Sequence, residues 1–218
     1  MSLNHRAALF RTRIKFCGLR RPGDLATAVA LGVDAIGLVL VPASARNLSI
    51  DAAAKLRARV PPLVDCVLLF KDADAGFVQE AIDAIHPDLL QFHGSEDAVF
   101  CASFGVSYLK ALAMGGPLSL RREARRYADA AGLLLDSHVA GGLGGRGETF
   151  DWCAVPKLAR PLLLAGGLTP ANVGRGIAAV QPFAVDVSSG IETRPGIKDA
   201  DKMRAFVAAV RRADQKTK

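Results

Sequence analysis

The sequence predicts an α/β protein with one domain, a compact (β/α)8 TIM barrel. Half of the 218 residues are hydrophobic, which supplies a substantial core and excludes intrinsic disorder. Short β-rich runs alternate with longer Ala- and Leu-rich segments, and this order indicates a parallel sheet with right-handed crossovers. Eight such units follow residue 12, with roughly 26 residues per unit. Eight units most often close into a barrel, although a typical barrel has ~250 residues.

The expected strands are apolar runs too short for an ordinary helix and bounded by Gly, Pro or Asp. In chain order they are Arg13–Cys17, Ala35–Val41, Leu63–Phe70, Leu89–His93, Ser107–Leu112, Leu133–Asp136, Leu162–Ala165 and Phe183–Val187. The helices between them have recognisable starts. Ser49 and Ser95 are N-cap candidates with acidic residues behind them, and Thr169 precedes a proline at the first helical position. Pro87 is expected to end the third helix.

An open, doubly wound sheet is the alternative fold. We find no linker or composition break, so the barrel is expected over residues 13–212, after an N-terminal arm (1–12) and before a polar C-terminal tail (213–218). The two most apolar stretches are interrupted by charged residues, Gly and Pro, which argues against a membrane-spanning helix. The arm also lacks the apolar core of a secretory signal. We therefore expect a cytoplasmic protein.

The net charge of +7 raises the question of a nucleic-acid partner. The basic residues gather at the chain ends and in Arg121–Arg126, and no aromatic residues that could stack on bases lie between them. We therefore expect no nucleic-acid partner, although a positive field would attract a small anionic substrate. The four cysteines are far apart, as in reduced cytosolic proteins. Neither they nor the four histidines have the spacing of a zinc site, so no metal is expected.

Two glycine-rich loops follow neighbouring strands at the end of the barrel where active sites lie. Gly166 and Gly167 follow the seventh strand, and Ser188, Ser189 and Gly190 follow the eighth. Glycines let backbone N–H groups approach an anion closely, and a following helix N-terminus adds positive charge. Together the loops predict a phosphate site. The alternative is that the glycines only form tight turns.

Cys17 and Asp136 end strands one and six, where their side chains can face each other across the barrel mouth. A thiol and a carboxylate in this arrangement can act as base and acid. The alternatives are a packed thiol and a capping aspartate. Strand alternation places Lys15 on the same face as Cys17, where it is expected to lower the pKa of the thiol. Asp186 on the neighbouring strand is expected to pair with Lys15, either structurally or in catalysis.

Polar residues after strands two and four complete the candidate site. The planar guanidinium of Arg46 is suited to a carboxylate, although a loop arginine can also be simply solvated. Gln91 and His93 end strand four. We expect His93 to be a supporting or structural residue rather than a base.

A series of motifs runs through the chain in a fixed order. They are Lys15-Phe16-Cys17-Gly18-Leu19, Pro42-x-Ser44-x-Arg46, Gln91-Phe92-His93-Gly94, Leu135-Asp136-Ser137, the run from Gly144 to Trp152, Leu164-Ala165-Gly166-Gly167-Leu168, the run from Val185 to Glu192, and Pro195-Gly196-x-Lys198-Asp199. With these motifs the chain resembles the phosphoribosylanthranilate isomerase family of tryptophan biosynthesis. The resemblance extends from Lys15 to about Lys202.

The resemblance implies a (β/α)8 barrel that catalyses an Amadori rearrangement without a cofactor. N-(5-phosphoribosyl)anthranilate would become 1-(2-carboxyphenylamino)-1-deoxyribulose 5-phosphate. By analogy Asp136 is the general acid, Cys17 is the general base, and Arg46 holds the anthranilate carboxylate. The other expected substrate contacts are Gln91, His93, Gly166, Gly167, Asp186, Ser188, Ser189 and Gly190, with Lys15 in support. A monomer or homodimer is expected, with a phosphorylated small molecule as its partner.

The chain departs from the family pattern at three places: Arg20 where Thr is frequent, Lys71-Asp72 after strand three, and Arg146 in the loop after strand six. Two other functions are alternatives. A related barrel isomerase of histidine biosynthesis would carry Asp in place of Cys17 and two similar phosphate-binding halves. A non-catalytic sugar-phosphate-binding barrel would need neither Cys17 nor Asp136.

Overall fold

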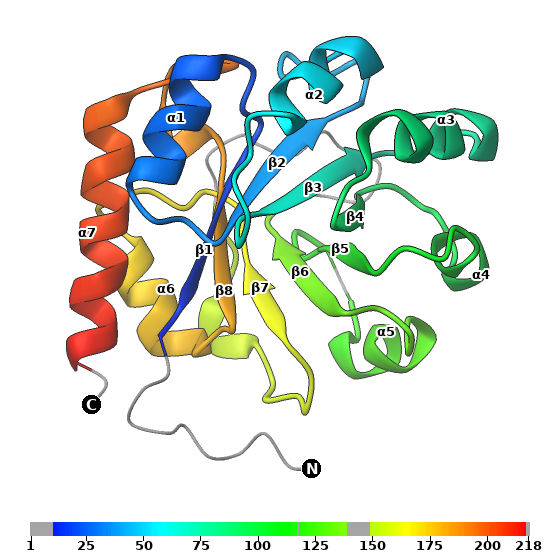
Figure 1. The fold of residues 1–218 in the computed structure, drawn as a ribbon. Coiled ribbons are helices and arrows are strands. Elements are labelled where there is room, and N and C mark those ends of the chain that lie inside the picture. Colours follow the sequence, from blue (N-terminus) through cyan, green and yellow to red (C-terminus); the bar gives the residue numbers. More distant parts are fainter. Residues whose placement is uncertain (1–10, 117, 139–148, 217–218) are drawn as a thin grey trace.

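The computed structural model describes residues 11–116, 118–138 and 149–216, and eight parallel strands close into a barrel in chain order (Figure 1). The strands are β1 (Arg13–Cys17), β2 (Ala35–Val39), β3 (Asp65–Phe70), β4 (Leu89–Phe92), β5 (Tyr108–Ala113), β6 (Gly132–Asp136), β7 (Leu162–Leu164) and β8 (Ala184–Val187). Each differs from its expected bounds by at most two residues. Pairing of β8 with β1 closes the ring, so the TIM barrel is confirmed and the open sheet is excluded.

Helices surround the strands, as strand–helix alternation requires. They are α1 (Pro22–Ala30), α2 (Ile50–Arg57), α3 (Ala75–Ile85), α4 (Ala98–Ala102), α5 (Leu120–Arg126), α6 (Val173–Val180) and α7 (Ala200–Lys216). In the described part of the β6–β7 connection, a short 3-10 helix (Trp152–Ala154) stands where an α-helix was expected. A second 3-10 helix (Ser189–Ile191) and a two-stranded hairpin, β9 (Glu192–Arg194) and β10 (Ile197–Lys198), connect β8 to α7.

Local sequence signals explain several helix ends. Ser49 accepts a hydrogen bond from the backbone N–H of Ala52, as an N-cap should. His86 ends α3 in the left-handed conformation, with φ of 51°, just before Pro87. The other two expected starts differ: Asp97 rather than Ser95 caps α4, and α6 begins three residues after Pro170.

Side chains alternate between the two faces of each strand. Ile14 and Phe16 point outward, where the Phe16 ring meets Phe206 of α7 at a centroid distance of 6.1 Å. This outer layer between barrel and helices holds the larger apolar cluster. The barrel interior holds a smaller cluster of mostly small or branched side chains, which includes Val67, Ala111 and Leu134. Lys15 and Cys17 point into the same interior, as strand alternation predicts.

The domain is longer at both ends than the sequence predicted. Residues 213–216 continue α7 instead of forming a polar tail. The reason is a tertiary contact: the Asp214 carboxylate accepts hydrogen bonds from the backbone N–H and the hydroxyl of Thr12. Thr12 is fully buried, and Arg11 pairs with Asp34. Residues 1–10 of the expected arm lie outside the described residues.

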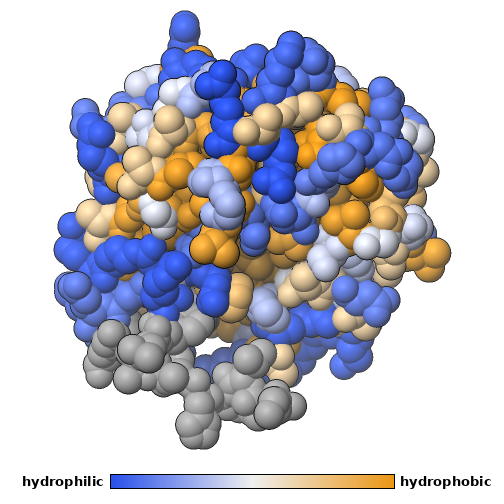
Figure 2. Space-filling view, in the orientation of Figure 1, coloured by the Kyte–Doolittle hydropathy of each residue, from blue (hydrophilic) through white to orange (hydrophobic). Residues whose placement is uncertain are grey.

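The face seen in Figure 2 carries hydrophilic side chains around its outline, and hydrophobic ones show between them. Within the described ranges, no helix has the length and hydropathy needed to cross a membrane.

Candidate active site

A cavity of about 340 Å³ opens at the carboxyl ends of the strands. Seven of the twelve predicted site residues line it: Cys17, Arg46, Gln91, His93, Asp136, Asp186 and Ser188. The other five, Lys15 and the glycine-loop residues Gly166, Gly167, Ser189 and Gly190, are not in the cavity wall. Apolar side chains from β2 and β3, among them Val39 and Leu69, complete the wall. A mixed lining of this kind suits a small molecule with an aromatic part and charged groups.

Cys17 lies at the floor of the cavity with 4% of its surface exposed. Below it, Nζ of Lys15 contacts Oδ1 of Asp186 at 2.9 Å, so the predicted buried pair is confirmed. A Cβ on Gly37 would lie 2.8 Å from Sγ, so glycine at this place in β2 makes room for the thiol. Burial raises the pKa of Cys17, and the Lys15 ammonium opposes this only in part. The expectation of a lowered pKa was therefore wrong, because desolvation outweighs the neighbouring charge.

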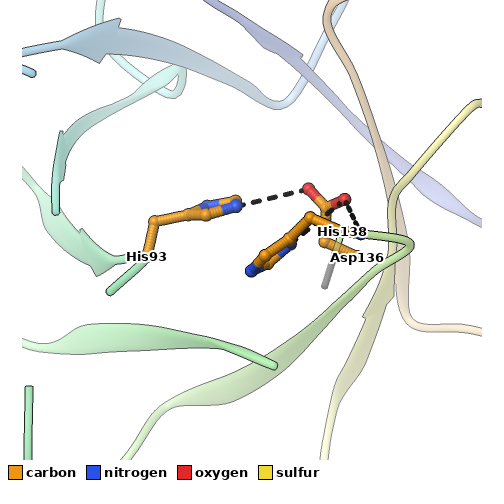
Figure 3. Close-up of side chains that lie close together, drawn as sticks. All are labelled: His93, Asp136 and His138. Carbon is orange, nitrogen blue, oxygen red and sulfur yellow. Dashed lines mark hydrogen bonds and ion pairs between the residues drawn. The ribbon is translucent and has the colours of Figure 1, made fainter. Parts of the chain in front are cut away.

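Asp136 ends β6, and its carboxylate contacts the imidazole rings of two histidines (Figure 3). Its Oδ2 is 3.4 Å from Nε2 of His93, and its Oδ1 is 3.4 Å from Nδ1 of His138. The backbone N–H of His138 also donates to Oδ1. Burial alone would raise the pKa of Asp136, but the two imidazoles hold it well below its usual range. The carboxylate and the two rings therefore form one polar cluster at the end of β6.

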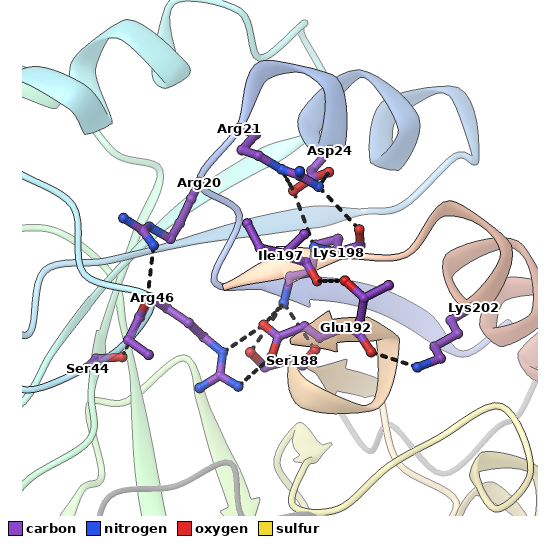
Figure 4. A network of polar contacts seen from close by, with 12 residues as sticks. Arg20, Arg21, Asp24, Ser44, Arg46, Ser188, Glu192, Ile197, Lys198 and Lys202 are labelled. Carbon is purple, nitrogen blue, oxygen red and sulfur yellow. Dashed lines mark hydrogen bonds and ion pairs between the residues drawn. The ribbon is translucent and has the colours of Figure 1, made fainter. Parts of the chain in front are cut away.

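Arg46 is held by a carboxylate of the protein itself (Figure 4). Its Nε and Nη2 donate to Oε1 and Oε2 of Glu192 at 2.8 and 2.7 Å. Nζ of Lys198 contacts the same Glu192 at 2.8 Å and donates to the carbonyl of Ser188. The Arg46 side chain is 14% exposed, so it is not a solvated loop arginine. The two hydrogen bonds to Glu192 use only one edge of the guanidinium. Arg46 also lines the cavity, where it can meet a ligand.

The two glycine-rich loops touch each other beside the cavity. A Cβ on Gly190 would lie 1.8 Å from the carbonyl oxygen of Leu168, so the second loop can approach the first only with glycine there. Gly166 and Gly167 have φ of 76° and 63°, which favours glycine at both positions. Asn172 fixes the first loop by donating to the Gly167 carbonyl. Packing thus accounts for part of this glycine pattern, and the phosphate prediction remains a prediction.

The sequence reasoning missed three residues of the site. Glu192 and Lys198 stand in the quoted motifs but received no role, and His138 was not singled out. Nothing in the spacing of His138 signals a function, because it meets His93 only after β4 and β6 are placed in the barrel. Glu192 could have been found from the sequence. It is an acidic residue close after the second glycine loop, in a region that also carries a lysine, and this position indicates a charged contact near the site.

The three departures from the family pattern have different outcomes. Arg20 donates from Nη1 to the carbonyl of Ala45 at 3.1 Å, which braces the loop that carries Arg46. Lys71 lines the cavity. Arg146 lies outside the described residues.

Comparison with known proteins identifies the family. A family model described as N-(5'phosphoribosyl)anthranilate (PRA) isomerase matches residues 14–209. The chain belongs to the phosphoribosylanthranilate isomerase family. Members of this family from Xylella fastidiosa (strain M23) and Stenotrophomonas maltophilia (strain R551-3) are each 51% identical to it, over 94% of this chain and 94% and 95% of theirs. The chain is therefore an enzyme, an isomerase of tryptophan biosynthesis, as the motifs implied.

Solved phosphoribosylanthranilate isomerases share the fold. The Thermotoga maritima enzyme matches with a TM-score of 0.80 at 32% identity, covering 92% of this chain and 98% of that one. A second structure, with a TM-score of 0.78, 32% identity and the same coverage, holds reduced 1-(o-carboxyphenylamino)-1-deoxyribulose 5-phosphate. A third, from Thermotoga maritima, concerns monomers generated from a dimeric isomerase; its TM-score is 0.76 at 30% identity, covering 92% and 98%.

Proposed function

We propose that this enzyme isomerises N-(5'-phosphoribosyl)anthranilate with Asp136 as general acid and Cys17 as general base. One observation carries the proposal: both side chains end barrel strands and line the same cavity, although they are 119 positions apart in the chain. The cavity walls also hold Arg46, a cation that suits the substrate's carboxylate. This arrangement favours catalysis over the alternative of a sugar-phosphate-binding barrel, which would need neither a thiol nor a buried carboxylate.

The first step opens the ribose ring. A proton passes to the ring oxygen, the C1–O bond breaks, and the anthranilate nitrogen supplies the electrons that form the iminium. Asp136 is the proposed donor. Its pKa is low in the free enzyme, so it must receive a proton first. His93 and His138 lie close enough to supply that proton, each 3.4 Å from one carboxylate oxygen.

The second step removes the proton from C2 of the sugar. The adjacent iminium acidifies this C–H bond, and the electron pair of the bond forms the enolamine, which then tautomerises to the ketone. Cys17 is the proposed base. Its burial in the cavity floor is suited to this role, because a positive iminium above the thiol favours the thiolate when substrate is bound.

The phosphate of the substrate should bind at the two touching glycine loops. Gly167, Ser189 and Gly190 form the proposed cradle, because glycines let backbone N–H groups approach an anion closely. A crystal structure with substrate analogue or phosphate tests this prediction. An anion bound elsewhere on the barrel, with these loops vacant, would contradict it.

Loss of anthranilate fluorescence tests the proposed reaction. Adding the enzyme to freshly prepared N-(5'-phosphoribosyl)anthranilate should produce a rapid decay, and the product should carry a ketone at C2. No decay above the spontaneous rate would reject the proposal. Turnover of a histidine-pathway substrate at a comparable kcat/KM would instead favour the related barrel isomerase.

Replacing Arg46 by alanine should weaken substrate recognition. A hydrogen bond to a charged group contributes about 1.5–3 kcal/mol, so kcat/KM should fall roughly 10- to 150-fold. Most of this change should appear in KM, because the carboxylate is bound in both ground and transition states. Removal of Arg46 also leaves Glu192 with Lys198 alone, so thermal unfolding must be measured in parallel. Arg204→Ala, on the exposed side of α7, is the matched control and should leave kcat/KM unchanged.

The pH dependence of kcat/KM should reflect the buried thiol. This parameter reports groups of the free enzyme, in which burial raises the pKa of Cys17. Because the thiolate is the active form, kcat/KM should rise with pH through an apparent pKa above the ordinary value of about 8.5. The kcat profile should rise at lower pH, since the bound iminium favours the thiolate. A pH–rate series at constant ionic strength measures the pH dependence of kcat/KM and of kcat. A rise of kcat/KM with an apparent pKa well below about 8.5 would contradict the assignment of Cys17 as the base.

We also propose that the enzyme is cytoplasmic, needs no cofactor and acts as a monomer or homodimer. The dimeric relative from Thermotoga maritima supports the second assembly. Sedimentation of the purified protein across a range of concentrations distinguishes the two.

A further inference from the structure

Three side chains with metal-binding atoms meet beside the cavity, and two of them, His93 and Asp136, line its wall. One imidazole nitrogen each of His93 and His138 and one carboxylate oxygen of Asp136 all lie within 4.8 Å of one another. His93 follows β4, while Asp136 and His138 come from the end of β6 and the residues after it (Figure 3). The rings of the two histidines lie against each other, with centroids 4.7 Å apart and planes inclined by 31°.

Hydrogen bonds among the described residues leave two imidazole nitrogens of this cluster, Nε2 of His93 and Nδ1 of His138, without a partner. The two imidazole nitrogens are 3.4 Å from the carboxylate oxygens, beyond the usual 2.7–3.2 Å for an N–H···O bond. Among the residues that the structure describes, five buried side-chain polar atoms make no hydrogen bond. Three of the five belong here: Nε2 of His93, Nδ1 of His138 and Oε1 of Gln91. Native proteins rarely leave such atoms without partners, so their concentration at one place indicates a missing partner.

The separations suit a tetrahedral metal ion. Ligand atoms about 2.0–2.2 Å from zinc stand about 3.3–3.6 Å apart in a tetrahedral site. Nε2 of His93 is 3.4 Å from Oδ2 of Asp136, and Nδ1 of His138 is 3.4 Å from Oδ1 of the same carboxylate. Two imidazoles and one carboxylate form a frequent three-ligand set for zinc, with the fourth position open. We infer that His93, Asp136 and His138 form a binding site for a divalent cation of the zinc type, with its open position toward the cavity.

Gln91 provides the outer contact that such a site needs. Its Nε2 lies 3.2 Å from Nδ1 of His93, and its Oε1 has no partner. If the Gln91 amide turns over, Oε1 accepts the Nδ1–H of His93. This leaves the lone pair of Nε2 directed at the metal, and a metal-bound histidine usually has such an acceptor on its other nitrogen. Metal binding together with this turn gives a partner to all three unsatisfied atoms.

A bound cation would inhibit the isomerase. It would take the carboxylate of Asp136 as a ligand and occupy space in the cavity that the substrate needs. The predicted inhibition rests on the function proposed above. Metal binding does not, because it depends on the three side chains alone. The site is therefore regulatory or inhibitory rather than catalytic, and inhibition should be competitive with substrate.

Zinc titration of the purified chain tests the binding part directly. After treatment with EDTA and its removal, zinc chloride is added in competition with a chromogenic chelator, and cobalt(II) is added separately for its visible absorption. We expect one equivalent to bind, with a cobalt spectrum of a four-coordinate site. His138→Ala should lower the affinity by at least about 100-fold, more than the loss of an outer-shell partner typically costs.

Two control variants separate this site from other metal-binding groups. Cys17→Ser removes the nearby thiol and should keep the bound zinc. His86→Asn removes an exposed histidine at the end of α3 and should also keep it. The inference is overturned if no equivalent binds, if His138→Ala binds zinc as tightly as the parent, or if Cys17→Ser loses the site. In the first two cases the histidines contact Asp136 without binding a metal ion.

Activity measurements test the inhibitory part. Micromolar zinc should raise the apparent KM without lowering kcat, and EDTA should restore the original rate. The enzyme in EDTA alone should keep its full activity, as expected for chemistry that needs no metal. Loss of activity in EDTA that a divalent ion restores would contradict an inhibitory site. Absence of any turnover in all conditions would instead reject the proposed function and leave the binding data unaffected.

Discussion

Replacing Cys17 by serine should lower kcat by about 10²–10⁴, the range typical for the loss of a positioned base. A serine hydroxyl keeps the shape of the thiol but does not ionise at accessible pH. The buried floor of the cavity would make an alkoxide still less favourable, since desolvation already raises the pKa of the thiol. The variant should fold normally and bind a product analogue, because Cys17 contributes little packing volume. Steady-state fluorescence decay at saturating substrate measures the effect.

The other cysteines provide the controls for this prediction. Cys153 is exposed, so Cys153→Ser should leave kcat nearly unchanged. Cys66 and Cys101 are buried outside the cavity, and burial raises the pKa of each to about 12. Neither can supply a thiolate near neutral pH. Near-native kcat in Cys17→Ser, with loss in any other cysteine variant, would show that the base is misassigned.

Replacing Asp136 by asparagine should lower kcat at least as much. The amide fills the same space beside His93 and His138 but cannot carry an acidic proton to the ring oxygen. It also removes the negative charge that contacts the two imidazoles, so the effect combines loss of the proposed donor with loss of these two contacts. The variant is compared with the parent in kcat, in affinity for a product analogue and in thermal unfolding.

An exposed aspartate is the matched control. Asp129→Asn lies outside the cavity and should have no effect on kcat. If Asp136→Asn kept more than about a tenth of the parent kcat, the proton would have to come from another donor, because a positioned acid typically contributes 10²-fold or more. His93 would then be the next candidate.

The barrel could be predicted because its signals are local. Alternating apolar runs, their Gly and Pro boundaries and the inward face of Lys15 and Cys17 depend only on neighbouring residues and strand geometry. The strict alternation failed where tertiary contacts override it. Residues 213–216 extend α7, where Asp214 accepts a hydrogen bond from Thr12. A hairpin lies between β8 and α7, and it carries Glu192 and Lys198, which contact each other, while Glu192 also accepts from Arg46.

The chemistry of the site was only partly accessible from the sequence. Motifs supplied Cys17, Arg46 and Asp136, and the cavity brings these three together. The pKa of Cys17 was not accessible, since its direction depends on how much burial outweighs the Lys15 charge. His138 was missed because sequence spacing can reveal a metal or proton-sharing site only when its residues lie in one loop or one helix. Here the two histidines are 45 positions apart and meet through the closure of the barrel.

The central claim is a division of labour: Asp136 opens the ring and Cys17 takes the proton from C2. Substrate carrying deuterium at C2 tests it most directly, by comparing kcat for the two isotopic forms in both variants. In Cys17→Ser, removal of the C2 proton becomes rate-limiting, so a primary isotope effect is expected. In Asp136→Asn, ring opening becomes rate-limiting, and the isotope effect should vanish. The opposite pattern, with a primary effect in Asp136→Asn and none in Cys17→Ser, would contradict the assignment of both roles.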